Sequence, residues 1–219
     1  MTSDATRPPG DQATGARVSA ALADAATIGP FFALGTQAAA PGWRPATACY
    51  RPGPDGFLAQ ATARLPAAEP RVAASIAQQA YAARLWSPVL ASALLHAVVP
   101  DLTHLQVRTP DTHQVRSPDP ASTLTLALDW PAGRPAPDLA AAAELSYQVV
   151  VTAHLEPLAL ALSGEVADGL LWGNAASALA GALGVLIGAR PAVRAPATAL
   201  AAALLDHGRL SDTGELGVT

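Results

Sequence analysis

The chain contains no lysine, a single cysteine and few aromatic residues. All 13 basic side chains among its 219 residues are arginines, and aromatic residues make up 5%. With Cys49 as the only thiol, the chain can form neither an intramolecular disulfide nor a site in which it supplies four thiolates. Arginine without lysine, together with abundant alanine, glycine and proline, reflects a GC-biased gene and points to no particular chemistry.

Charged residues are scarce as well. They make up 14% of the chain, whose net charge is −4 and whose pI is near 5.6. Without a basic stripe or arginines interleaved with aromatics, we expect no nucleic-acid partner. The first residues, MTSDATRPPGDQATGAR, lack a basic region followed by an apolar core, so we expect no secretory signal and a cytoplasmic protein.

Several catalytic motifs are missing. The glycines at 181, 184 and 188 have neither dinucleotide-binding nor P-loop spacing, and GxSxG and HExxH do not occur. The five histidines form no metal set by spacing. We therefore predict no metal site and no bound cofactor for this chain.

The longest apolar run is 169–189, GLLWGNAASALAGALGVLIGA. As a helix it places leucines and alanines on one face, and the small residues Gly173, Ser177 and Gly181 on another ridge. Small residues let a second helix approach closely, so we expect both faces to be buried. The length would also admit a membrane span, but the alanine- and glycine-rich composition and Asn174 favour a buried central helix.

The remaining patterns predict an α+β fold, a predominantly helical single domain with a small antiparallel sheet. We predict that residues 1–16 form a disordered tail and that residues 17–219 form the domain. Two alternating segments, 104–108 and 122–130, predict the strands. Helical patterns cover 17–26, 71–83, 139–163 and 197–206. Asp138 caps the third of these helices, and Pro157 either kinks or restarts it. Ser87-Pro88 indicates either a new helix or a kink in one long helix.

Candidate binding residues lie at the helix breaks. Arg84 and Trp86 precede Ser87-Pro88, and an arginine beside a tryptophan can hold an anion. Composition alone favours the alternative, a buried tryptophan with a solvent-directed arginine. His154 precedes Pro157, where it could bind a ligand or cap a kink. Trp172 and Asn174 begin the apolar run, and the asparagine either bridges to neighbouring backbone or lines a pocket.

Four blocks in order resemble the ferric-siderophore reductases of the FhuF type, in their actinobacterial branch. The blocks are RVAASIAQQAYAARLWSPVLASALLHAVVPDL, HLEPLALAL, LLWGNAASALAGAL and LAAALLDHGRLSDTGEL. The resemblance runs from about residue 17 to the last residue, and LLWGNAASAL is its most specific part. The resemblance implies a cytoplasmic protein that takes part in reductive release of iron from an imported ferric siderophore. A related module also occurs in siderophore synthetases of the IucA/IucC type.

The family's electron carrier is a 2Fe-2S cluster, held by a C-terminal Cys-Cys pair and a following Cys-x-x-Cys. In this sequence that segment would begin beyond GELGVT, and Cys49 lies far upstream. The resemblance thus implies a body without its cluster, through truncation or natural loss, and inactive by itself. The expected partners are a ferric siderophore and an electron-donor protein.

Two functions follow from these observations. The first is the siderophore-binding part of such a reductase, with Arg84, Trp86, His154, Trp172 and Asn174 as candidate contacts to an anionic ferric complex. The alternative is a non-enzymatic module that binds a siderophore or associates with a siderophore synthetase. The sequence does not identify the siderophore, the electron donor or the oligomeric state.

Overall fold

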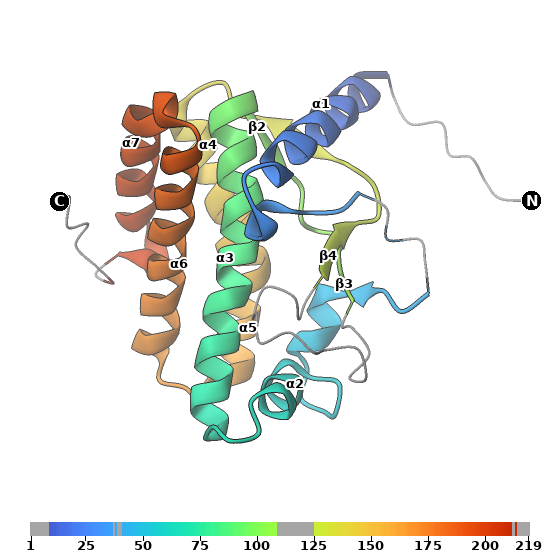
Figure 1. Cartoon of the computed structure of the whole chain (residues 1–219), viewed down its shortest axis with the longest axis vertical. Coiled ribbons are helices and arrows are strands. Elements are labelled where there is room, and N and C mark those ends of the chain that lie inside the picture. Colours follow the sequence, from blue (N-terminus) through green and yellow to red (C-terminus); the bar gives the residue numbers. More distant parts are fainter. Residues whose placement is uncertain (1–8, 37, 39–40, 109–124, 212, 214–219) are drawn as a thin grey trace, which may run out of the picture.

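A computed structural model describes residues 9–36, 38, 41–108, 125–211 and 213. Helices dominate, and short antiparallel strands lie on one side of them, so the predicted fold class is confirmed (Figure 1). Helix α1 spans Pro9–Ala26, so the predicted tail boundary at residue 16 is wrong for residues 9–16. Residues 1–8 lie outside the described part.

The centre of the molecule is α3, Pro70–His96. It packs against α1, α2 (Phe57–Arg64), α4 (Leu139–Tyr147) and α6 (Asp168–Ala189). Its residues 84–93 are all buried. Pro88 lies inside this helix, and the Ser87 hydroxyl donates a hydrogen bond to the Ala83 carbonyl at 2.7 Å. Of the two alternatives at Ser87-Pro88, a new helix is therefore excluded.

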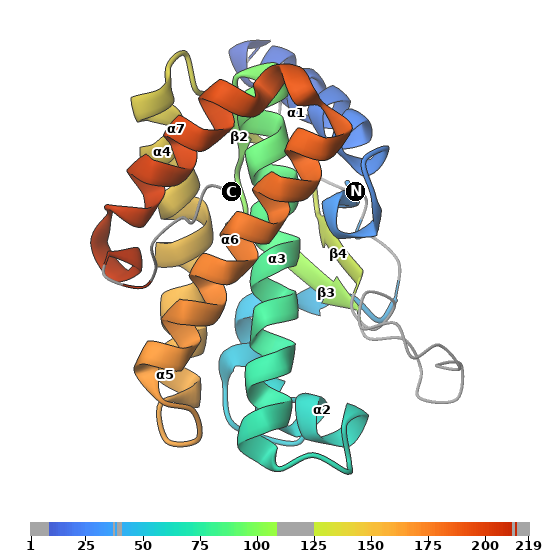
Figure 2. The same cartoon turned by 60° about the vertical axis from the view of Figure 1, so that its left-hand side comes forward.

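The apolar run forms α6, Asp168–Ala189, as predicted, but only one of its faces is buried. Leu171, Ala175 and Leu179 face α3, whereas Ser177 and Gly181 are exposed and Gly173 is partly exposed. A Cβ atom at Gly173 or Gly181 would meet nothing within 4 Å. The prediction that both faces are buried is wrong, because α3 packs on the leucine face and α6 runs along the outside of the molecule (Figure 2).

A second long helical segment packs against α3. It consists of α4 (Leu139–Tyr147), the π-helical segment η4 (Gln148–Leu155) and α5 (Glu156–Leu162). The Asp138 carboxylate accepts a hydrogen bond from the Ala141 N–H at 2.8 Å, which confirms the predicted cap. Pro157 lies in the first turn of α5, and the chain stays helical through it, with the wider π turns immediately before the proline.

The predicted strand pair is present as β3 (Leu105–Arg108) and β4 (Thr125–Leu128), antiparallel with Leu105 opposite Leu128. Residues 122–124 of the predicted strand lie outside the described residues. Strand β1 (Arg44–Pro45) extends this sheet. Strands β2 (Val98–Pro100) and β5 (Gly133–Pro135) form a second antiparallel pair, although the sequence predicted only a proline-rich connector at 131–137.

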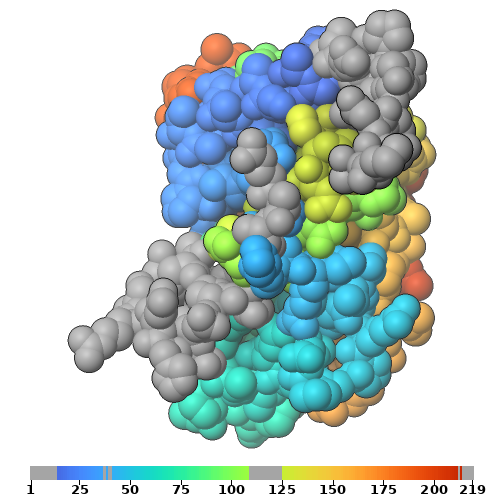
Figure 3. Space-filling model, turned by 90° about the vertical axis from the view of Figure 1, so that its right-hand side faces the viewer, coloured from blue at the N-terminus to red at the C-terminus, as the bar shows by residue number. Residues whose placement is uncertain are grey.

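The C-terminal part continues with η5 (Pro191–Val193), α7 (Arg194–Leu205) and η6 (Gly208–Leu210). On the opposite side, η1 (Pro30–Phe32), η2 (Ala46–Tyr50) and α2 surround the strands, and Figure 3 shows this face. Two helical stretches, Leu139–Leu162 and Asp168–Ala189, are long and apolar enough to cross a membrane by composition. In each stretch, 56% of the most apolar 18-residue window is buried inside the fold.

Candidate functional site

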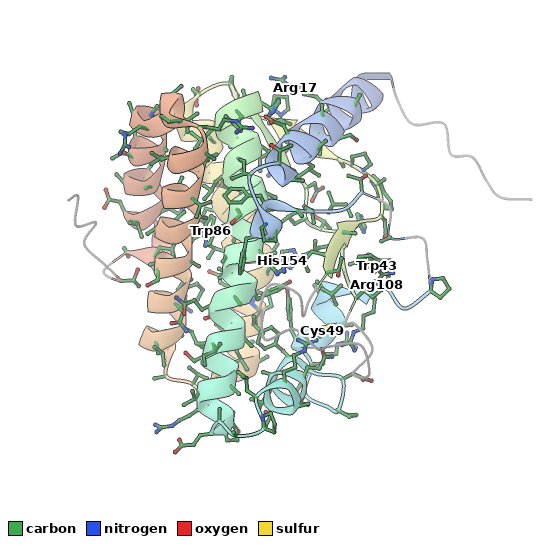
Figure 4. The ribbon with its side chains drawn as sticks, in the orientation of Figure 1. Arg17, Trp43, Cys49, Trp86, Arg108 and His154 are labelled. Atoms are coloured by element: carbon green, nitrogen blue, oxygen red, sulfur yellow. The ribbon has the colours of Figure 1, made fainter. Side chains whose placement is uncertain are left out.

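The five predicted contact residues do not form one site. Figure 4 shows Trp86 on the side of α3 that faces α6, and His154 on the side of the strands. Trp86 is fully buried, and within the described residues its Nε1 has no hydrogen-bond partner. The guanidinium of Arg84, 7% exposed, lies 5.2 Å from the centre of the Phe31 ring. Neither side chain presents a surface to a large ligand.

Trp172 and Asn174 lie near each other at the start of α6. The Trp172 Nε1 donates to Asp168 Oδ1 at 3.0 Å, and the guanidinium of Arg209 lies 5.7 Å from the ring centre. The Asn174 amide donates to the carbonyl and hydroxyl oxygens of Ser75 at 3.2 and 2.9 Å. Both side chains are buried, since Trp172 is 4% exposed and Asn174 9%. Through its hydrogen bonds to Ser75, the asparagine bridges α6 to the backbone of α3.

His154 belongs to a buried polar cluster that the sequence did not predict. Its Nε2 is 3.0 Å from the carbonyl oxygen of Leu102, and its Nδ1 is 2.7 Å from the Tyr50 hydroxyl. The Tyr50 hydroxyl is also 2.7 Å from that of Tyr81. The cluster joins η4, η2 and α3 with the segment before β3.

The carbonyl of Leu102 fixes the direction of every hydrogen bond in this cluster. Because a carbonyl only accepts, the Nε2 of His154 must carry its proton and Nδ1 must accept from the Tyr50 hydroxyl. The Tyr81 hydroxyl then donates to the Tyr50 oxygen. A chain of hydrogen bonds thus runs from the Tyr81 hydroxyl through the Tyr50 hydroxyl to the neutral imidazole of His154.

Burial holds all three members of the cluster in their neutral forms. It lowers the pKa of His154 to about 4, against the weaker opposing effects of the Leu102 hydrogen bond and the charge of Asp101. Burial likewise raises the pKa of Tyr50 well above its usual value and raises that of Tyr81. Near neutral pH the cluster carries no charge.

A cavity adjoins the cluster, and the two tyrosines line it. Its volume is about 30 Å³, room for one or two water molecules, and it lies between η2, α2, α3 and β3. The other walls include Phe57, Cys49 and Arg64. Cys49 is 7% exposed, and burial is the main cause that raises the pKa of its thiol, only partly offset by Arg44 and Arg64. At neutral pH the thiol stays protonated, which makes it a weak nucleophile.

A second, more polar and larger cavity of about 210 Å³ lies along the π-helical segment. Its walls include Asp101, Thr103, Arg134 and Gln148. These side chains are already paired: Arg134 donates to Gln148 Oε1 at 2.7 Å, and the Thr103 hydroxyl donates to Asp101 at 2.6 Å. π-Helical turns are frequent at functional sites, and this one holds His154 in the cluster.

Sequence reasoning found His154 but not its partners. Tyr50 and Tyr81 are 104 and 73 positions away from it, and no local spacing connects them. The only available signal was the buried character expected of an aromatic residue such as Tyr50 in a long loop.

The residues present do not fit the 2Fe-2S cluster that the resemblance implies. In the described part of the chain no group of three or more histidine, cysteine or acidic side chains could hold a metal. Cys49, the only thiol, is enclosed between η2 and α2 with aromatic and arginine neighbours, and one thiolate cannot replace four.

Comparisons with protein-family models, with curated proteins and with solved structures found no match. The resemblance described above therefore depends on the quoted sequence blocks alone.

Proposed function

We propose that this chain binds a ferric siderophore as the body of a FhuF-type reductase of iron acquisition in the cytoplasm. One observation supports this proposal above others: the blocks of the resemblance, far apart in the sequence, pack together. They correspond to α3, the end of η4 with α5, α6, and α7 with η6. Helix α3 packs on α6, and α6 packs on both α7 and η6.

The binding surface that we propose is the edge where η6 meets the start of α6. The Arg209 N–H donates to the Tyr147 hydroxyl at 2.9 Å, and Gly208 adopts a left-handed conformation with φ of 51°. These contacts hold the exposed Arg209 guanidinium over the Trp172 ring. Trp172 supports this edge from beneath, and the ligand would contact Arg209 and its neighbours first.

The charges at this edge refine the expected ligand. Arg209 lies 3.8 Å from Asp168, and His207 lies 3.9 Å from Glu144. The Asp168 carboxylate lowers the positive potential around Arg209, so the edge suits a ferric chelate of low net charge better than a strongly anionic one. Neutral and weakly charged ferric hydroxamates are therefore the ligands of choice.

The test is a titration of the full chain with a ferric trihydroxamate and with its iron-free form, followed by tryptophan fluorescence and by calorimetry. We expect saturable binding of the ferric form, and a Kd raised several-fold by Arg209→Gln. Arg194→Gln, an exposed arginine at the start of α7, is the matched control and should bind like the wild type. Absence of binding, or equal affinity in all three proteins, would overturn the proposal.

The second candidate is a non-enzymatic siderophore-binding or synthetase-associated module. The solitary Cys49 favours it, because reduction through a cluster requires thiolates that this chain does not supply. Anaerobic assays of the complete native gene product with a chemical reductant separate the two functions. Iron release that depends on that protein supports the reductase, whereas binding without iron release supports the module.

A further inference from the structure

The polar cavity along η4 carries one acidic and one basic side chain on its walls, Asp101 and Arg134. Its volume of about 210 Å³ exceeds what a few ordered water molecules fill, since one water occupies about 30 Å³ of the liquid. The volume is also smaller than that of sites for drug-sized ligands, which begin at about 300 Å³. The cavity therefore suits a small organic molecule.

The pairing of β2 with β5 places the two charged side chains on one face of this small sheet. Val99 is opposite Arg134, and the Asp101 N–H donates to the Ala132 carbonyl at 2.8 Å, which continues the ladder by one residue. Directly opposite residues, and alternate residues along one strand, point to the same side of a sheet. Val99, Asp101 and Arg134 therefore line the cavity together, and η4 supplies another wall.

Neighbouring polar groups orient the two charges without neutralising them. The N–H and the hydroxyl of Thr103 both donate to Oδ1 of Asp101, at 2.9 and 2.6 Å. Arg134 donates through Nη2 to Gln148, which in turn donates to Glu144. Within the parts of the chain that the structure describes, Oδ2 of Asp101 and the other nitrogens of Arg134 have no hydrogen-bond partner, and neither residue belongs to an ion pair.

The remaining walls of the cavity are apolar. Val99 is 2% exposed and Val149 8%, and Ala153 lies one π-helical turn further along η4. A ligand that satisfies this cavity needs an ammonium group for Asp101, a carboxylate for Arg134 and a short aliphatic group for the valines. A guanidinium can bind a carboxylate through two parallel hydrogen bonds, so the nitrogens of Arg134 that Gln148 does not use suffice for this contact.

We propose that this cavity binds a small aliphatic amino acid as its zwitterion, with the ammonium group on Asp101 and the carboxylate on Arg134. A dicarboxylate would bring a like charge to Asp101, and a diamine would bring one to Arg134, so the zwitterion fits both groups best. None of the residues that line the cavity belongs to the edge at Arg209 and Trp172. The site therefore does not depend on siderophore binding.

The experiment is a calorimetric titration of the full chain with L-valine and with two analogues of similar shape. L-Valinamide keeps the ammonium group and lacks the carboxylate, whereas isovalerate keeps the carboxylate and lacks the ammonium group. We expect L-valine to bind about tenfold or more tightly than either analogue, because each analogue loses one charge-assisted contact.

Two substitutions assign the charges of the ligand to the two walls. Arg134→Gln should raise the L-valine Kd about tenfold or more and remove the preference over L-valinamide, but keep the preference over isovalerate. Asp101→Asn should remove the preference over isovalerate only, and its amide oxygen can still accept from Thr103. Arg51→Gln and Glu165→Gln alter exposed charges elsewhere and should leave the Kd unchanged.

A third substitution tests the place of binding without changing any charge. Ala153→Leu should fill the cavity from η4 and abolish the binding of L-valine. Thermal unfolding verifies that each variant is folded. The proposal is refuted if L-valine does not bind, if either analogue binds as tightly as L-valine, or if the folded variants of Asp101, Arg134 and Ala153 bind it like the wild type.

Discussion

Both ring nitrogens of His154 have a partner, and this pairing decides what the residue does. The imidazole donates to Leu102 and accepts from Tyr50 in a site where it is 1% exposed. Loss of the ring would remove one partner from the Leu102 carbonyl, which still accepts from the Leu105 N–H, and one from the Tyr50 hydroxyl, which still pairs with Tyr81. The cost is about 0.5–1.5 kcal/mol for each lost hydrogen bond. We therefore assign His154 to holding η4 against η2 and the strand side of α3, and not to a siderophore contact.

His154 also predicts how stability depends on pH. Its pKa is 6.5 in an unfolded chain and about 4 in the fold, so between these values the unfolded chain binds a proton that the folded chain does not. The stabilisation is complete above pH 6.5 and is lost as the pH falls towards 4. We expect the free energy of unfolding to decrease by about 3 kcal/mol across this window.

Denaturant unfolding at several pH values measures this decrease. His154→Gln should be less stable at pH 7 and should show a much smaller change between pH 7 and pH 4. His104→Gln alters an exposed histidine and should keep the wild-type slope. Parallel pH profiles for wild type and His154→Gln would show that the imidazole is not the titrating group. Asp24, whose pKa is lowered mainly by its hydrogen bond with His96, acts only at lower pH.

At the scale of single elements, the glycines of α6 and of η6 have different surroundings and different effects. On the outer ridge of α6 the glycines face open space, whereas Gly208 in η6 lies against the Tyr147 side chain. Glycine therefore weakens α6 through its backbone freedom, whereas η6 requires a glycine at position 208.

We predict that Gly181→Ala stabilises the protein by about 0.5–1 kcal/mol, because alanine costs less backbone entropy in a helix and meets no neighbouring atom. Thermal unfolding of the purified variant measures the effect. A destabilised variant would indicate that another helix packs on this ridge, as the sequence pattern first suggested.

We predict that Gly208→Ala destabilises the fold by about 2–3 kcal/mol. A Cβ atom there would overlap the Tyr147 hydroxyl, and a side chain is strained at φ of 51°. Gly164→Ala is the control, because its Cβ atom would meet nothing within 4 Å and should change stability by less than about 0.5 kcal/mol. Chemical denaturation compares the two. Equal effects would contradict the proposed fixation of η6.

At the scale of the whole molecule, one end of the fold is joined by a network of charged groups. Asp24 of α1 accepts hydrogen bonds from His96 at the end of α3, 2.9 Å away, and from Arg190 after α6, 3.1 Å away. Arg17 of α1 donates to the carbonyl of His96 at 2.8 Å. Three helices that are distant in the sequence are thus connected where their ends meet.

We predict that Asp24→Asn lowers the free energy of unfolding by less than about 1 kcal/mol, because the pairs are partly exposed and screened by water. Addition of 1 M salt should reduce the difference from wild type, since it screens exposed charges. Glu165→Gln, an exposed acid after α5, is the control and should have no effect. A difference that persists unchanged in high salt would contradict an electrostatic origin.

The sequence by itself determined the helical class, the cap at Asp138 and the pairing of β3 with β4, since capping and strand alternation depend on residues a few positions apart. Tertiary structure alone decided that α3 and not α6 is central, and that Ser177 and Gly181 face solvent. It also brought Tyr50 and Tyr81 to His154. These outcomes depend on which distant segments pack together, and a residue's position on a helix face does not specify what that face meets.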